Sequence, residues 1–531
     1  AKIDEPVAEV EQSPTPQVNP SQHATTTPPI SSEPVTAPKP TPAPAKAAPV
    51  QTAAMDGEVV ITWDGPLVMR PIEDPMSTAL ATEEVAIEFT SSSRVEFDAP
   101  IQGMHGSADA IRYGATNGIV ELVGTTDSRI KIIANDTGML ESEVFHAQLG
   151  TGVITIDSPG MLESTPVTNE PPARIHWGRS AEFALVQTED GELSSRLRSA
   201  RFEGAVLGTR ADAVLQTQSL VASLDEEGPM ESSLRSIKLT QGSMRSDSGS
   251  LTSDEMTIGF VPMNNGTGVT PSTLDADGSV LGVSVDGRVE TDQLDAILVR
   301  EPDGQTRVRR ATAIGSTEFL GENQTRASGQ RVELNTDSDT IHIIGSRGDK
   351  GSAGQGGSII QGEDIWINTR SRSIQVNGPG TFDHDIVTDG VATGGHLNVK
   401  WTESMRFDDA IGSIECAGDV VALSTPDAYT TDTLKADRLE IDLTPTGETD
   451  QVRSPDAVAQ DDSVTRELLT ARAYGRAVPG SESIPASVES RTYDPQQPER
   501  AIGVMYLEGP SSRDDGADGQ IQRGWCRCSG G

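Results

Sequence analysis

The chain has 531 residues, which exceeds one ordinary domain, and its 52 glycines with few aromatic residues (Phe 9, Trp 5, Tyr 5) favour β-structure with thin aliphatic cores. The formal net charge of −39 argues against nucleic acid as a partner, because phosphate binding depends on Lys and Arg. It also argues against electrostatic docking on an anionic membrane.

Cysteine content and the chain start bear on location. Cys416, Cys526 and Cys528 are too few for a disulfide framework. No run of about 18 apolar residues is present, so no membrane-spanning helix is expected. The chain begins at Ala1 and shows no signal peptide, so we expect that a leader was removed or a longer precursor trimmed. We therefore expect export to the periplasm or cell envelope, with any anchor in a segment outside this chain.

The two ends of the sequence read as flexible. The first 50 residues hold 12 of the 33 prolines among Thr, Ala, Ser, Glu and Lys, so residues 1–55 are predicted to form an extended, disordered linker. The alternative is a tail without a role. Residues 513–531 are predicted to form a flexible tail.

From Met55 onward, short apolar stretches alternate in period two between Gly, Asp, Asn and Pro, which predicts strands and hairpins. Residues 439–443 give the clearest strand, with acidic residues between the apolar ones. Residues 332–334 and 341–343 predict a second pair, joined by a polar turn. Ser463 to Ala473 is the best helical candidate.

A small Ala-containing motif, often Ala-Asp, recurs with its alanines at 108, 211, 327 and 436. Trp63, Trp177 and Trp401 each follow a β-type stretch, and a missing copy would fall near Val289. Self-similarity at a fixed period signals repeats. The spacing predicts four units of about 110 residues, at 56–165, 166–280, 281–388 and 389–512; chance similarity among strand-turn sequences is the alternative.

The predicted units also end in similar segments, in which a strand is followed by a Pro-Gly or Gly-Pro turn. These closing segments are Ile154 to Gly160, Ile374 to Gly380 and Tyr506 to Pro510.

Several signals for chemistry are weak. Asp383, His384 and Asp385 have metal-ligand residue types, but three adjacent residues cannot all point at one ion, so a solvated turn is expected. The glycine-rich residues 348–357 lack phosphate-loop spacing and are expected to form a mobile hairpin loop. No catalytic grouping has a local signature, so no catalytic residue, metal or cofactor is expected and the protein is not expected to be an enzyme. A polysaccharide-processing enzyme stays open.

Two segments carry a family resemblance. Residues 107–124 combine an Ala-containing start, a Tyr, a polar turn and an apolar strand ending in Gly, and residues 326–345 repeat this shape. Residues 488–509 do so in degraded form. The pattern resembles the LptA/OstA-like family of periplasmic lipopolysaccharide-transport proteins. The resemblance implies an elongated V-shaped stack of antiparallel strands, a β-jellyroll or β-taco.

The resemblance further implies an apolar groove between two sheets that holds acyl chains of lipopolysaccharide or another lipid. It also implies end-to-end strand addition with other envelope transport proteins. Packing as an ordinary sandwich core is the alternative for each residue. The groove candidates are Ile111, Val120, Leu122, Ile154, Ile156, Val332, Leu334, Ile341, Ile343, Ile365, Ile367, Ile374, Val376, Leu439, Ile441 and Leu443.

Two functions follow from these expectations. The first is non-enzymatic lipid transport or bridging in the bacterial envelope. The second is a structural or adhesive surface protein of tandem β-repeats. A continuous stack of strands would favour the first, and separate closed sandwiches would favour the second.

Overall fold

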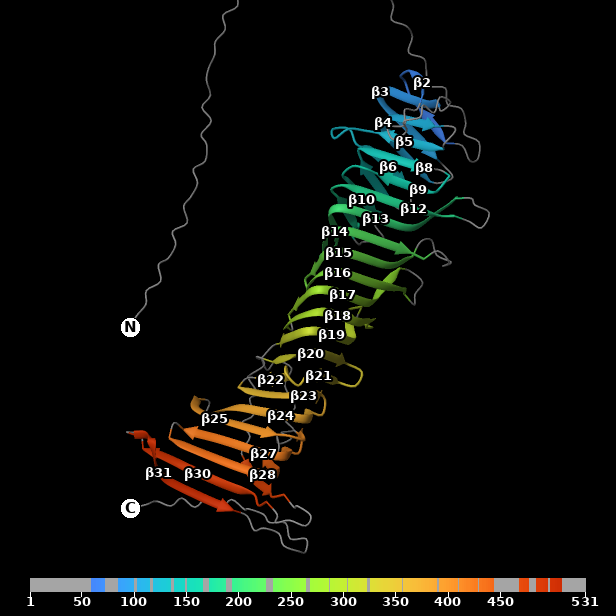
Figure 1. Cartoon of the computed structure of the whole chain (residues 1–531). Helices are drawn as coiled ribbons and strands as arrows, with labels where there is room; N and C mark the ends of the chain where they lie inside the picture. The colour runs from blue at the N-terminus through green and yellow to red at the C-terminus, as the bar shows by residue number, and fades with distance from the viewer. Residues whose placement is uncertain are drawn as a thin grey trace, which may run out of the picture. The chain divides into compact units, whose positions relative to one another are not determined.

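A computed structural model shows an all-β protein, which confirms the fold class (Figure 1). The chain divides into two units, residues 1–51 and 52–531, and all described residues belong to the second. The described residues include no helix that could cross a membrane. They are 59–71, 85–99, 103–114, 118–134, 138–148, 150–165, 171–187, 193–225, 233–263, 268–285, 287–302, 304–321, 325–355, 357–388, 391–408, 410–427, 429–443, 468–476, 484–494 and 497–508.

The described residues form 31 strands of one antiparallel sheet. Their bounds are β1 Val60–Thr62, β2 Leu67–Pro71, β3 Val85–Ala99, β4 Met104–Gly114, β5 Ile119–Val123, β6 Ile130–Ala134, β7 Gly138–Ser142, β8 Val144–Gln148, β9 Val153–Ile156, β10 Gly160–Ser164, β11 Arg174–Trp177, β12 Ser180–Gln187, β13 Leu193–Arg210, β14 Ala213–Leu224, β15 Leu234–Ser246, β16 Gly249–Pro262, β17 Val269–Ser284, β18 Gly287–Arg300, β19 Thr306–Gly321, β20 Arg326–Asn335, β21 Thr340–Ile344, β22 Gly351–Gln355, β23 Ser358–Asn368, β24 Ser373–Thr388, β25 Val391–Trp401, β26 Ser404–Asp408, β27 Ser413–Asp427, β28 Thr430–Leu443, β29 Leu468–Tyr474, β30 Ser487–Asp494 and β31 Gln497–Glu508.

Each long strand pairs with one series of strands along its first half and with a second series along its second half, so the sheet consists of two columns of paired strands. The first half of β13 pairs with β12, for example, and its second half pairs with β11. We call the column that contains β2, β5, β8, β9, β12, β21, β26 and β29 leaf A. We call the column that contains β1, β6, β7, β10, β11, β22, β25, β30 and β31 leaf B. The remaining strands cross from one leaf to the other, so both leaves continue along the whole ladder in Figure 1.

The two leaves face each other across a shared apolar interior. The ring of Trp177 in leaf B lies 5.4 Å, centroid to centroid, from that of Phe202 in the leaf A half of β13. One buried cluster contains Leu239 of leaf A together with Val280 of leaf B. A flat sheet could not bring these residues together, so the sheet is folded lengthwise into a V.

We call the line along which the crossing strands bend the crease. At the crease β13, β15, β17 and β19 have residues with positive φ: Gly204 (82°), Gln241 (51°), Gly278 (74°) and Gly315 (103°). The pairing register shifts at three of these points, as expected for β-bulges. Successive positions are 37 residues apart (241−204, 278−241 and 315−278). The repeating unit of this region is therefore one pair of crossing strands.

Carboxylates of neighbouring strands lie against two of the three crease glycines, whereas Gly204 lies against Arg179. Asp254 of β16 lies beside Gly278, and Asp292 of β18 lies beside Gly315, so closely that a Cβ at either glycine would collide with the carboxylate. The backbone N–H of Ser316 donates to Oδ2 of Asp292 at 3.2 Å. Glycine is needed here because it adopts positive φ without strain and leaves room for the acid.

Buried hydroxyls satisfy backbone groups on the inner side of the crease. Thr217 Oγ1 donates to the carbonyl of Thr240 at 2.6 Å, and Thr291 Oγ1 donates to that of Ile314 at 2.9 Å. Thr291 also lies 3.0 Å, oxygen to oxygen, from Thr317. Bulges interrupt the regular ladder, and a buried carbonyl without a partner is costly, so the hydroxyls compensate for the bend.

The tryptophan and turn markers of the sequence lie at the crease. Trp177 covers Gly160 and Trp401 covers Gly380, and their indole N–H groups donate to the carbonyls of Ser158 and Gly378 at 2.9 and 3.1 Å. The spacing of about 110 residues is roughly three of the 37-residue strand pairs. The four-unit division stays a prediction, and its boundary at 280/281 falls inside β17.

Several local expectations are wrong. Ser463 to Ala473 is no helix where it is described, because Leu468–Tyr474 forms β29, with Ala473 buried beside Leu439. The glycine-rich loop contains β22, which buries Ala353. Asp383 to Asp385 lies within β24 rather than in a turn. The predicted linker 1–55 and tail 513–531 lie outside the described residues.

We expect Gly315→Ala to lower the free energy of unfolding by about 1–3 kcal/mol, because alanine is strained at this φ and its methyl would collide with Asp292. Urea denaturation followed by circular dichroism measures the effect. Gly348→Ala is the control, since nothing lies within 4 Å of the added methyl there. Equal stability of the two variants would contradict the proposed role of the bulge.

Candidate functional site

Two unbroken apolar rows line the inner face of leaf A. We call the row next to the crease row 1. Its residues pair with one another across successive strands, except that Phe145 and Ile156 each lie one residue beyond the last pair of β8 and β9, His146 with Thr155. Row 1 consists of Phe89, Ile111, Leu122, Phe145, Ile156, Ala181, Phe202, Leu220, Leu239, Met256, Ala276, Leu294, Ala313, Val332, Ile343, Ile365, Val376, Met405, Cys416, Leu439 and Ala473.

Row 2 lies two residues further from the crease, nearer the open edges of the V. Most of its side chains are only partly buried. Row 2 consists of Ile87, Tyr113, Val120, Ala147, Ile154, Phe183, Ala200, Ala222, Ile237, Ile258, Leu274, Ala296, Ala311, Leu334, Ile341, Ile367, Ile374, Phe407, Ile414, Ile441 and Ala471.

The structure brings fifteen of the sixteen groove candidates into these two rows. Those in row 1 are packed as core, and Ile156, Ile343 and Ile365 have no exposed surface at all. Those in row 2, such as Ile341 and Ile374, are partly buried. Leu443 lies beyond row 2, opposite Leu468. Row 2 is therefore the part of leaf A that a ligand between the leaves could touch.

The facing row on leaf B was missed by sequence reasoning. Glycines at 106, 208 and 282 interrupt its apolar residues, which hides the period of two. Partly buried members still pack against the buried clusters. They include Phe97, Ile132, Leu140, Leu162, Ile175, Leu215, Met244, Leu251, Phe319, Phe382, Ala422 and Leu434.

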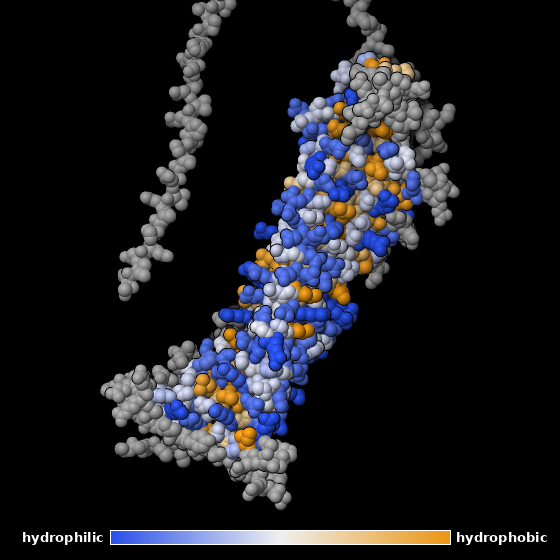
Figure 2. Space-filling model, in the orientation of Figure 1, coloured by the Kyte–Doolittle hydropathy of each residue, from blue (hydrophilic) through white to orange (hydrophobic). Residues whose placement is uncertain are grey.

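The outer face of leaf A carries a polar row in the same register. Arg112 bonds Glu121 at 2.9 Å and Glu88 at 3.3 Å, and Arg438 bonds Glu415 at 2.8 Å. The carboxylate of Glu121 in particular raises the pKa of Arg112. Such cross-strand pairs favour one register, because a slip by one residue would exchange the inner and outer rows. Figure 2 shows apolar side chains in separate patches among polar ones.

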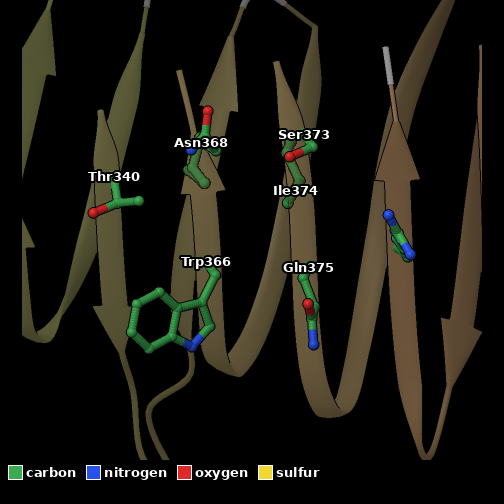
Figure 3. Close-up of a pocket in the computed structure, with 8 residues that line it drawn as sticks. Thr340, Trp366, Asn368, Ser373, Ile374 and Gln375 are labelled. Atoms are coloured by element: carbon green, nitrogen blue, oxygen red, sulfur yellow. The ribbon is translucent and has the colours of Figure 1, made fainter. Parts of the chain in front are cut away.

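Two shallow depressions lie on leaf A. One, of about 320 Å³, is lined by polar residues that include Thr155, Glu182 and Arg201. The other, of about 300 Å³, is lined by Thr340, Trp366, Ile367, Asn368, Ser373, Ile374, Gln375 and Arg406 (Figure 3).

The described residues contain no group of three or more His, Cys, Asp or Glu that could hold a metal ion. Asp383 and Asp385 both lie 3.3 Å from nitrogens of His396, whereas His384 lies 2.8 Å from the hydroxyl of Ser358. Burial lowers the pKa of His384. The three adjacent residues thus divide between two sets of partners.

A comparison of the chain with models of known protein families finds no match, and neither does a comparison with curated proteins.

Cys416 of row 1 should be unreactive in the native protein. Its side chain is buried, and burial raises the pKa of its thiol to about 12, so about one molecule in 10⁴ is a thiolate near pH 8. A variant with Cys526→Ser and Cys528→Ser leaves it as the sole thiol. We expect a thiol reagent to label it only in concentrated denaturant; rapid labelling without denaturant would show that row 1 is open.

The stability contributed by Asp364 should be lost in acid. Burial alone would raise its pKa, but hydrogen bonds from Asn377 and His342, with the charge of His342, lower the pKa below its ordinary value. The carboxylate therefore stabilises the fold above about pH 4, and this contribution disappears as the pH falls through the lowered pKa. We expect Asp364→Asn to lower the urea midpoint at neutral pH, by an amount that shrinks towards zero at lower pH. A pH-independent difference would refute this assignment.

Proposed function

We propose that this protein is a non-enzymatic lipid carrier or bridge of the bacterial cell envelope, whose cargo lies along row 2 between the leaves. The single observation that carries the proposal is that row 2 runs without a charged residue from Ile87 to Ala471 through one continuous stack. Lipopolysaccharide, or another lipid with long acyl chains, is the cargo that the resemblance to the LptA/OstA-like family favours.

The length of row 2 supports bridging rather than the storage of one lipid. Its 21 residues stand on neighbouring strands about 4.8 Å apart, so the row extends for roughly 100 Å. Half the hydrocarbon core of a bilayer measures about 15 Å. Several acyl chains could thus lie in series along one path.

Burial of acyl chains supplies enough free energy without a specific polar contact. Each methylene removed from water contributes about 0.8 kcal/mol. The partly buried isoleucines at 341, 367 and 374 offer apolar surface on three adjacent strands. The head group would stay outside the V, because no charged side chain of rows 1 and 2 could hold it.

The ends of the stack are suited to strand addition. Among the described strands, β1 and β2 each pair only with β3, β29 pairs only with β28, and β31 pairs only with β30. A strand that pairs on one side only within the described part of the chain can take up a further strand on its other side. We propose that related envelope proteins join here, which would extend row 2 beyond this chain.

A structural or adhesive role is the second candidate function. It is favoured by row 1, whose side chains fill the space next to the crease as in a sandwich core. On this alternative the leaves would hold only their own side chains, and no lipid would enter.

Photo-crosslinking at adjacent residues tests the proposal. A photoreactive residue at Leu274, which is partly buried in row 2, should form an adduct with added lipopolysaccharide or with a long-chain lipid. The same residue at the exposed neighbour Thr273 is the matched control, because successive side chains of a strand point to opposite faces.

We expect an adduct at position 274 at least about tenfold stronger than at 273, removed by excess unlabelled lipid. Equal labelling at the two positions, or none with any long-chain lipid, would favour the structural role instead.

A further inference from the structure

Trp366 is a flat aromatic surface on the outer face of leaf A, away from rows 1 and 2. Its side chain is 41% exposed, although its neighbours along the outer row are polar. The indole stacks on the ring of His342, with centroids 3.7 Å apart and planes inclined by 16°. In Figure 3 Trp366 reaches sideways towards the strand of Thr340, which also carries His342. One ring face is thus covered by His342, and the opposite face is turned outward.

The support beneath the indole is rigid. His342 Nε2 lies 2.6 Å from Oδ1 of Asp364, and His342 Nδ1 lies 3.5 Å from Glu333. Asn377 donates to the other oxygen of Asp364 at 2.8 Å. The histidine side chain is only 14% exposed, so it serves as the base of the platform and not as a contact for a ligand.

Polar side chains surround the platform. Gln375 is paired with Trp366 across the strands, and Arg406 is paired with Gln375. Together with Asn368, Ser373 and Thr340 they line the depression of about 300 Å³. Asn368, Ser373 and Thr340 hydrogen-bond to Ser338 and Ser371 of the adjoining turns, which leaves the amide of Gln375 and the guanidinium of Arg406 as the main groups for a ligand. None of the lining residues is a carboxylate.

This combination fits one ligand class. A pyranose ring has an apolar C–H face that can stack on an indole, and a rim of hydroxyls that pair with amides and guanidinium groups. A shallow site on a sheet surface suits a chain of sugars that lies across it better than an enclosed small molecule. The chain's net charge of −39 favours a neutral saccharide over an acidic one.

We propose that the Trp366 platform binds a neutral oligosaccharide, with one sugar ring stacked on the indole and its hydroxyls bonded to Gln375 and Arg406. The platform's stacking and polar side chains belong to the outer row of leaf A, and row 2 contributes only Ile367 and Ile374 to the lining of the depression. A proline-rich segment could also lie on a tryptophan, but grooves for such segments are lined by several aromatic residues, and the lining here has one.

Titration with lipid-free oligosaccharides tests the proposal. Cellohexaose, maltohexaose and chitohexaose are added in turn to the full-length protein, and binding is followed by calorimetry and by tryptophan fluorescence. We expect at least one of them to bind, and Trp366→Ala to weaken this binding about tenfold or more. Trp366→Phe should retain part of the affinity, because the smaller ring can still stack, and Gln375→Ala should reduce it less than Trp366→Ala.

Trp63→Ala is the matched control. Trp63 is 40% exposed but meets Phe89 edge to face, with centroids 4.9 Å apart, and does not line the depression. Saccharide binding that is lost in Trp366→Ala and kept in Trp63→Ala supports the proposal. Binding of none of the three saccharides, or equal binding by Trp366→Ala, overturns it. Trp366-dependent binding of a synthetic proline-rich peptide, without saccharide binding, also overturns it.

Discussion

The bend of the backbone at the crease is the constraint on which both leaves depend. Side chains of a strand point alternately to its two faces. A strand that crosses the crease must therefore shift this alternation, so that its apolar residues point into the interior on both leaves. It does so by a change of spacing: four residues from Phe202 to Val206 in β13, and three from Thr291 to Leu294 in β18. Strands with spacing four have a bulge with positive φ; beside the bulges of β17 and β19 the neighbouring strand places a carboxylate, and beside that of β13 lies Arg179. The apolar interior follows from this alternation, since both leaves would otherwise expose half of their apolar residues.

The same change of spacing explains which features the sequence could predict. Within one leaf the period of two is intact, so residues 439–443 and the hairpin of 332–343 are strands as expected. Across the crease the period breaks, so the sequence predicts short strands and does not show that one strand crosses both leaves. The inner row of leaf B was missed because glycines stand at inward positions, where Gly282 makes room for Val289. β22 read as a loop for a related reason: its Gly351 lies against Ile343, where a Cβ would collide.

The two faces of leaf A differ in the side chains they carry: the inner face is apolar and the outer face is polar. Row 1 fixes the fold through burial, row 2 is mostly only partly buried, and the outer row sets the register through pairs such as Arg112 with Glu121. Trp366 departs from this division, because it places a large apolar ring in the polar outer row. An exposed aromatic residue held flat by the partly buried pair of His342 and Asp364 has no evident use in stability, and such departures are where binding is expected.

Between β13 and β19 the crease positions recur every 37 residues, so this part of the stack is built in equal steps. A strand that crosses from leaf A to leaf B must be followed by one that returns, so chain can be gained or lost without damage only in whole out-and-back pairs. Each pair lengthens the stack by two strand spacings, or about 10 Å. The length of this part of the stack is therefore set in whole steps, each of them one pair of crossing strands.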